Sequence, residues 1–508
     1  MSNSIVGKIV ACIILVALCF VVGAQAAESA KGSVAMLIAI VGGIFVLIMG
    51  PRCWMLIFLL PPLLQILPLP SFNRTFMISI VVLAYWVCMW GMGYVKIRWR
   101  GLFLLDMLVL ILFGLMVAAF IKRPVTILAL GLEVDNVGGA VYAYALGALI
   151  CYLAYSIIPI SARQLSKVLR WSIWIMVVCA FIGAIKGAIL GGGGKVEEMG
   201  LAEAAQSTRF GAFQYLGETL SLVIYASVPL SRLLCSPVML LGMFASFAGI
   251  ALSGFRSLLA SQVLVLSFMA FVKRELSFLI VLGMMAFGGL LVLSSSGALM
   301  SLPFGIQRTL SFLPGMKVSA AASLAGTSST DWRVVMWNWA MDPRTKYIKD
   351  YTWGDGFGMS YAAMRRDARA IMRGESVYGD QEAFADRGLW HSGWIVAIHR
   401  LGIVGLVVIS LFLVYMFALV LRTACSLRGT PLFVPALVYI MPYTVVPLMH
   451  NLSAGTIESL WNRFYIVAMT KLLYCIAREE GLLKPLSLRR RYVPQMIAEH
   501  GDRLQQHA

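Results

Sequence analysis

Long apolar runs recur along this 508-residue chain, from Ile5 to Ile476, and they constrain its fold more than any other feature. A helix needs roughly 20 mainly apolar residues to cross the hydrocarbon core of a bilayer, and these runs recur at about that length. The chain is 60% hydrophobic and only 13% charged, whereas a soluble protein carries about a quarter charged residues. We therefore exclude a soluble enzyme and predict an all-α polytopic membrane protein.

Fourteen apolar runs are candidate transmembrane helices. They cover approximately 5–27, 34–50, 53–69, 76–94, 102–120, 139–159, 168–190, 211–230, 237–254, 257–272, 275–294, 394–421, 432–449 and 460–477. Prolines cluster in and just after the run 53–69, which predicts a kinked or partly re-entrant segment there. The stretch 238–271 is too long for one crossing, so we divide it at 253–256, where its single charge, Arg256, lies.

Basic residues in the short loops orient these spans, because Lys and Arg are enriched on the cytoplasmic side of a membrane. With the N-terminus inside, one face receives the basic clusters at 52, 96–100, 163–170, 232, 273–274, 422–428 and 489–491. Both termini then lie in the cytoplasm, and the long segment 295–393 lies on the outer face. The net charge of +18 is therefore mainly a topology signal and gives no evidence for nucleic-acid binding.

The predicted topology divides the chain into five parts. They are N-terminal transmembrane helices (1–200), a transmembrane core with arginine motifs (201–294), a large outer loop that caps an outward-facing cavity (295–393), C-terminal transmembrane helices (394–477) and a basic cytoplasmic tail (478–508). Residues 1–26 have a second interpretation, because Lys8, an apolar core and an A-x-A sequence ending at Ala26 also fit a cleaved signal peptide. Cleavage would remove one crossing and leave every outer loop in place.

Four titratable residues stand out on the outer half of the predicted topology: Arg209, Arg256, Arg333 and His391. An arginine near a membrane is costly enough to be functional by default, and its planar guanidinium forms paired hydrogen bonds with phosphate oxygens. A histidine accepts a proton from a hydroxyl at neutral pH. The alternatives are a snorkelling interface anchor for Arg256 and, for His391, a hydrogen bond to a loop carbonyl.

Aromatic and acidic residues extend this set of candidates. Trp337 lies one helical turn from Arg333 and offers a flat surface on which a sugar ring stacks. The tryptophans of the outer loop also fit an aromatic belt at the membrane interface. Glu218 is a charge inside a predicted span, where it would pair with an arginine or hold an acceptor hydroxyl.

Four further candidates lie around the return of the chain to the membrane. His399, two helical turns after His391 and next to Arg400, is either a second site residue or a contact within the helix bundle. The amides of Gly354 and Gly356 would line a ligand, because a residue without a side chain allows close approach. No H-E-x-x-H motif and no paired acidic run accompany these residues, so we expect neither a metal nor a cofactor.

Four short stretches follow one another on the outer side of the predicted topology. They are 208–213 with Arg209, 253–257 with Arg256, the pair Arg333 and Trp337 followed by 354–356, and 391–394 leading to 401–405. Their order and sidedness resemble the O-antigen polymerase and O-antigen ligase superfamily of bacterial membrane glycosyltransferases. The resemblance covers about 200–420. Ser392 stands where the family usually has Asn, and Phe255 where it commonly has Ser.

This resemblance implies an enzyme of the bacterial inner membrane that acts on the periplasmic face. Its donor would be an undecaprenyl-diphosphate-linked glycan, transferred without metal and with inversion at the anomeric carbon. Arg209, Arg256 and Arg333 would hold the diphosphate, and His391 would activate the acceptor hydroxyl. The acceptor is either another glycan, as in a polymerase, or a lipid or protein, as in a ligase, and fourteen spans lean slightly towards the polymerase. Other polysaccharide-assembly proteins would be partners.

A flippase for lipid-linked oligosaccharides, or another secondary transporter, is the alternative from a different functional class. Such a protein would carry ionisable residues at the membrane midplane and an internal repeat. The sequence shows no such repeat, and its candidate polar residues gather at the outer face. We therefore favour the glycosyltransferase.

Overall fold

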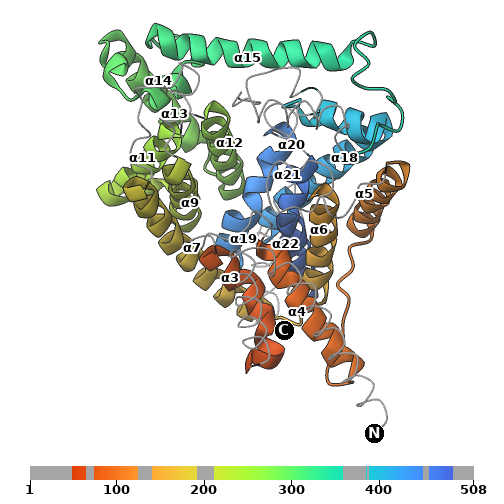
Figure 1. The fold of residues 1–508 in the computed structure, drawn as a ribbon. Coiled ribbons are helices and arrows are strands. Elements are labelled where there is room, and N and C mark those ends of the chain that lie inside the picture. The colour runs from red at the N-terminus through yellow and green to blue at the C-terminus, as the bar shows by residue number, and fades with distance from the viewer. Residues whose placement is uncertain are drawn as a thin grey trace, which may run out of the picture.

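The computed structural model of this chain describes residues 48–64, 74–123, 140–190, 211–253, 255–357, 385, 388, 390–449 and 457–483. All regular elements in these ranges are helices (Figure 1). In chain order they are η1 (Gly50–Met55), α3 (Leu56–Leu64), α4 (Arg74–Gly91), α5 (Phe103–Lys122), α6 (Ala140–Ile157), α7 (Ala162–Leu190), α9 (Gly211–Ser227), α10 (Leu230–Cys235), α11 (Pro237–Leu252), α12 (Arg256–Lys273), α13 (Leu276–Ser295), η3 (Ala298–Ser301), α14 (Phe304–Leu310), α15 (Ala320–Met341), α18 (Gly393–Ser426), α19 (Phe433–Ile440), η5 (Met441–Val445), α20 (Val446–Met449), α21 (Ile457–Asn462) and α22 (Phe464–Glu479). The predicted all-α class is confirmed for the part of the chain that the structure describes.

Four of the described helices, α5, α7, α12 and α18, are long and apolar enough to cross a membrane by length and composition. Shorter apolar helices occupy most of the other predicted spans between residues 53 and 449. These helices indicate a membrane protein, since a helix satisfies its own backbone hydrogen bonds in lipid. The fourteen crossings and their orientation stay predictions, and the run 5–27 lies outside the described residues.

The apolar stretch 238–271 is divided where its charge lies, because α11 ends at Leu252 and α12 begins at Arg256. Within this region α9 and α11 pack closely. A Cβ added to Gly217 would lie 2.4 Å from the carbonyl oxygen of Ser246, so only glycine fits there. Small residues of this kind let the backbones of membrane helices approach each other.

The proline-rich run 53–69 begins in the 3-10 helix η1 and continues as α3, which contains Pro61 and Pro62. Proline lacks the amide that would continue the helical hydrogen bonding, so these positions weaken the last turn of α3. Whether the run is re-entrant stays a prediction, because residues 65–69 lie outside the described part of the chain.

Helix α18 is broken at Gly402, whose φ of 71° and ψ of −175° are not helical. A side chain is excluded at this position, because a Cβ on Gly402 would lie 2.0 Å from the carbonyl oxygen of Thr352. The predicted span 394–421 is therefore two helical pieces that meet at a glycine. Such a break leaves backbone amides and carbonyls without their usual partners.

Residues 351–356 supply the partners that the break removes. Four backbone hydrogen bonds join this segment to α18, from Ile403 to Tyr351 (2.8 Å), Val404 to Thr352 (3.4 Å), Asp355 to His399 (2.7 Å) and Gly356 to Arg400 (3.1 Å). Irregular backbone at membrane depth is tolerated where protein covers and satisfies it. The segment therefore fixes the loop that contains α15 to α18, the helix that follows it in the chain.

A buried ion pair joins α5 and α22 at the end of the bundle away from Gly402. Lys471 is 1% exposed, and its ammonium lies 2.6 Å from a carboxylate oxygen of Asp106. The same ammonium donates a hydrogen bond to Ser156 of α6, and the Tyr152 hydroxyl donates to Asp106. Three helices thus meet at one charged contact.

We predict that Lys471→Met destabilises the protein by about 2–4 kcal/mol, because the substitution leaves the partly buried Asp106 carboxylate without its cation. The measurement is thermal or chemical unfolding of the purified protein in detergent. The double variant Lys471→Met/Asp106→Asn should lose less stability than the single variant, since it leaves no uncompensated charge. An equal loss in both variants would contradict a role for this ion pair.

Candidate functional site

Helix α15 lies across one end of the molecule, above α12 and α20 (Figure 1). The sequence places this helix in the outer loop 295–393, which also contains η3 and α14. The first residue of α12 and the residues just before α18 lie near α15, because the charge of Arg256 acts on Arg333 and the Trp337 indole donates to the carbonyl of Trp390. The candidate site is built where these three parts of the chain meet.

Arg256 stands at the first position of α12, and its side chain is half-buried. The break between α11 and α12 puts it at the end of a membrane-length helix, where unpaired amides and the helix dipole favour an anion. Because no side chain caps this end, the backbone adds to the positive potential of the guanidinium.

Arg333 extends from α15 into the same region. Its pKa is lowered first by burial and second by the charge of Arg256, so the two guanidinium groups lie within electrostatic range of each other. Two like charges held together in a partly buried place repel one another, and an anion between them would relieve that repulsion. The pair is therefore suited to a phosphate or diphosphate.

His391 completes the group. Burial and the nearby Arg333 lower the pKa of its imidazole to about 4, so the ring is neutral at physiological pH. Its ring centre lies 5.1 Å from that of Trp332 in an edge-to-face arrangement. Its φ of 50° is in the left-handed region that non-glycine residues rarely adopt, and such strain persists where the surrounding structure enforces it.

Tryptophans hold the segment that carries His391. The indole N–H of Trp337 donates to the carbonyl of Trp390 (2.9 Å), and the Trp390 indole N–H donates to Nδ1 of His399 (3.0 Å). Trp390 itself is fully buried. Trp337 thus anchors α15 to the chain beside His391. Trp390 also anchors this segment, through its hydrogen bond to His399. The sequence did not predict this contact, because a tryptophan that packs and a tryptophan that anchors a segment look the same in a single sequence.

His399 and Arg400 are buried and belong to the junction at Gly402. Nε2 of His399 lies 3.5 Å from a carboxylate oxygen of Asp355, and the Arg400 guanidinium donates to the carbonyl of Gly356 (3.2 Å). These contacts are of the kind expected from the second interpretation of His399, a contact within the helix bundle, and a role in the site stays a prediction. Arg400 is likewise held by a contact within the bundle, through its hydrogen bond to Gly356.

Gly354 and Gly356 have φ values of 74° and 76°. Other residues rarely adopt this backbone conformation, which explains why both positions are glycine. Their amides are hydrogen-bonded within the protein. They donate to the carbonyls of Asp350 (2.9 Å) and Arg400 (3.1 Å), and a Cβ on Gly354 would lie 2.4 Å from the backbone of Arg400. Both glycines therefore position α18, which differs from the ligand-lining role expected from their sequence.

Glu218 lies on α9, where one carboxylate oxygen accepts a hydrogen bond from the Gln214 side chain (3.1 Å). Arg463, between α21 and α22, interacts electrostatically with this carboxylate. Arg463 was missed as a candidate, although a charge inside the predicted span 460–477 was a signal for it. Arg209 lies outside the described residues.

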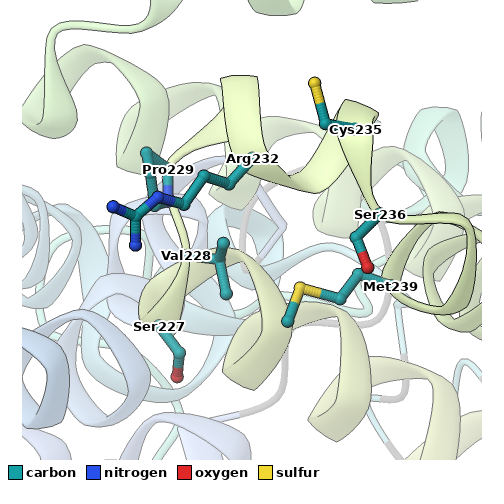
Figure 2. Close-up of a pocket in the computed structure, with 7 residues that line it drawn as sticks. All are labelled: Ser227, Val228, Pro229, Arg232, Cys235, Ser236 and Met239. Atoms are coloured by element: carbon teal, nitrogen blue, oxygen red, sulfur yellow. The ribbon is translucent and has the colours of Figure 1, made fainter.

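A separate open pocket of about 400 Å³ lies at the opposite end of the bundle (Figure 2). Arg232, Cys235 and Met239 line it, around the connection from α9 to α11. The Lys273 ammonium, at the last residue of α12, donates to the carbonyls of Tyr225 and Val228 beside this pocket. Since α12 has 18 residues and rises about 1.5 Å per residue, the pocket is far from Arg256.

The sequence matches no protein-family model, and no curated protein and no solved structure matches it at a significant level.

We predict that Arg333→Gln raises the pKa of His391 above about 4. The substitution removes the positive charge that disfavours the imidazolium, while burial keeps the pKa below the ordinary value of about 6.5. The measurement is hydrogen–deuterium exchange at the imidazole carbon, followed by mass spectrometry across pH. Lys317→Gln, a charge change elsewhere in the outer segment, is the control. An unchanged midpoint in Arg333→Gln would show that the two residues are not neighbours.

Proposed function

We propose that this protein is a membrane glycosyltransferase of the O-antigen polymerase or ligase type. It would transfer or polymerise an undecaprenyl-diphosphate-linked glycan on the periplasmic face of the bacterial inner membrane. The observation that carries the proposal is the grouping of Arg256, Arg333 and His391 beneath α15. These residues come from three separate parts of the chain; the packing of Trp332 on His391, the hydrogen bond from Trp337 to Trp390 and the effect of the Arg256 charge on Arg333 support their grouping.

In the proposed reaction the arginines act on the leaving group. The bond between the anomeric carbon and the diphosphate oxygen breaks, and its electron pair leaves with the diphosphate. Negative charge therefore grows on the phosphate oxygens, where Arg256 and Arg333 would already be placed to stabilise it. A guanidinium also pairs with two phosphate oxygens at once, which fixes the orientation of the donor.

His391 would take the proton of the acceptor hydroxyl while that oxygen attacks the anomeric carbon from the face opposite the diphosphate. Attack from this side inverts the configuration. In the protein alone the imidazole is a weak base, because burial and Arg333 lower its pKa to about 4. A bound diphosphate would offset the charge of Arg333 and strengthen the base, so proton transfer would be favoured only when the donor is present.

The outer segment would support this chemistry by covering the site. Trp332 packs against His391, and Trp337 anchors α15 to the chain beside it. Excluding water strengthens the electrostatic effect of the arginines and protects the activated donor from hydrolysis. The acceptor is either the growing glycan or a different lipid or protein, and Arg209 would add a third guanidinium to the donor site.

We predict that His391→Ala and Arg256→Ala each abolish glycan assembly in the native host, lowering product by roughly 100-fold or more. The measurement is profiling of surface glycans and of lipid-linked intermediates. A polymerase defect would leave single repeat units, whereas a ligase defect would leave long glycan on undecaprenyl diphosphate. Arg232→Ala, at the opposite end of the bundle, should have no effect. Normal glycan at normal abundance in both site variants would refute the assignment.

A further inference from the structure

The imidazole of His399 is buried beside the candidate site, and its two ring nitrogens face different partners. The indole N–H of Trp390 donates to Nδ1 (3.0 Å), and Nε2 lies 3.5 Å from a carboxylate oxygen of Asp355. Because Nδ1 accepts a hydrogen bond, the single proton of the neutral ring is on Nε2, on the side of the carboxylate. The two partners therefore fix one tautomer of His399 and the orientation of its ring.

Asp355 is itself held by backbone groups. Its carboxylate accepts hydrogen bonds from the amides of Lys349 and Asp350 (both 3.0 Å), and its own amide donates to the carbonyl of His399 (2.7 Å). The chain also covers the ring closely, because a Cβ added to Gly388 would lie 2.8 Å from Nδ1 of His399. The imidazole is thus enclosed as well as hydrogen-bonded, which keeps Nδ1 in one position.

Trp390 carries this position to the next residue, His391. The indole of Trp390 is held by His399, and its carbonyl accepts a hydrogen bond from the indole N–H of Trp337 on α15 (2.9 Å). On the other side of His391, Ser392 is fully buried at the start of α18. Both chain neighbours of His391 are therefore fixed.

His391 lies between these neighbours in a backbone conformation that it would not keep alone. Its φ of 50° is in the left-handed region, and a residue with a side chain stays there only where its surroundings enforce it. In this conformation its ring packs edge-to-face against Trp332, with 5.1 Å between the ring centres. If the hydrogen bond from Trp390 to His399 is lost, we expect the backbone of His391 to relax and its imidazole to leave Trp332.

We propose that His399 is a positioning residue, which holds His391 in place by accepting the indole N–H of Trp390. His399 acts through Trp390 and does not itself touch the substrate. A contact within the helix bundle thereby sets the geometry of the site. The inference rests on the proposed function where it treats His391 as the base, whereas the position of His391 can be measured without any glycan.

The test compares two substitutions of His399 that are nearly equal in size. His399→Asn keeps an acceptor oxygen close to the position of Nδ1, whereas His399→Leu removes the acceptor. Trp390→Phe removes the same hydrogen bond from the donor side. These three variants separate the loss of this one bond from the loss of the imidazole.

The first readout is hydrogen–deuterium exchange at the imidazole carbon of His391, measured across pH on the full-length protein in lipid nanodiscs. In His399→Leu and Trp390→Phe the pKa of His391 should rise from about 4 towards the ordinary value of about 6.5, because the ring leaves its buried place beside Arg333. In His399→Asn the midpoint should stay close to that of the wild type.

The second readout is glycan transfer by the same proteins. In His399→Leu and Trp390→Phe kcat should fall by roughly 10- to 100-fold, because a displacement of about 1 Å misplaces the base. KM for the lipid-linked donor should stay unchanged, since Arg256 and Arg333 remain. The double variant Trp390→Phe/His399→Leu should be no worse than either single variant, because all three lose the same hydrogen bond. His399→Asn should keep most of kcat.

Trp86→Phe, the same change in a buried tryptophan of α4, is the control and should leave both readouts unchanged. The unfolding temperature of every variant shows that the protein is folded. An unchanged His391 midpoint in folded Trp390→Phe would overturn the positioning role, and so would an equal loss of kcat in His399→Asn and His399→Leu. A shifted midpoint together with a wild-type protein that transfers no glycan would instead refute the proposed function and leave the positioning role in place.

Discussion

The break in α18 at Gly402 is the constraint on which the arrangement of the site depends. A membrane-length helix that is interrupted must have its freed amides and carbonyls satisfied by protein, and residues 351–356 do this through four backbone hydrogen bonds. Lys122 at the end of α5 donates to the carbonyl of Gly354 in the same segment, and its ammonium lies 2.6 Å from a carboxylate oxygen of Asp350, just before it. The outer segment is thereby fixed to two helices. Trp390 and His391 lie just before α18, so their position follows from that attachment.

The charged residues around this framework fall into two groups, those that join helices and those of the candidate site. The Lys471–Asp106 pair is compensated and joins helices, and the buried Arg400 donates to a carbonyl at the helix break. Burial and then the charge of Arg256 lower the pKa of Arg333, and burial and then the charge of Arg333 lower the pKa of His391, so the three side chains lie within electrostatic range of one another. Like charges brought together at a cost to the protein are expected where an anion binds. This contrast, more than the net charge of the chain, distinguishes the candidate site.

Much of the helical fold follows from the sequence, because apolar runs and interrupting charges mark helix positions directly. The division at Arg256 is an example, because α11 ends at Leu252 and α12 begins at Arg256. Gly402 was not predicted as a break, because a lone glycine is common in membrane helices and its partner segment lies some fifty residues away. The sequence also does not show that Gly356 pairs with Arg400, which is distant in the chain. Gly354 and Gly356 therefore suggested a ligand, whereas their amides donate to backbone carbonyls.

The central claim is that this group of residues transfers a glycan from its lipid diphosphate, and reconstitution tests it most directly. Purified protein in liposomes would receive undecaprenyl-diphosphate-linked oligosaccharide and an acceptor glycan, and the products would be separated by mass. We predict release of undecaprenyl diphosphate in step with formation of a new glycosidic bond of inverted configuration. Movement of the intact lipid-linked oligosaccharide across the bilayer, with no release of undecaprenyl diphosphate, would contradict the account and indicate a transporter.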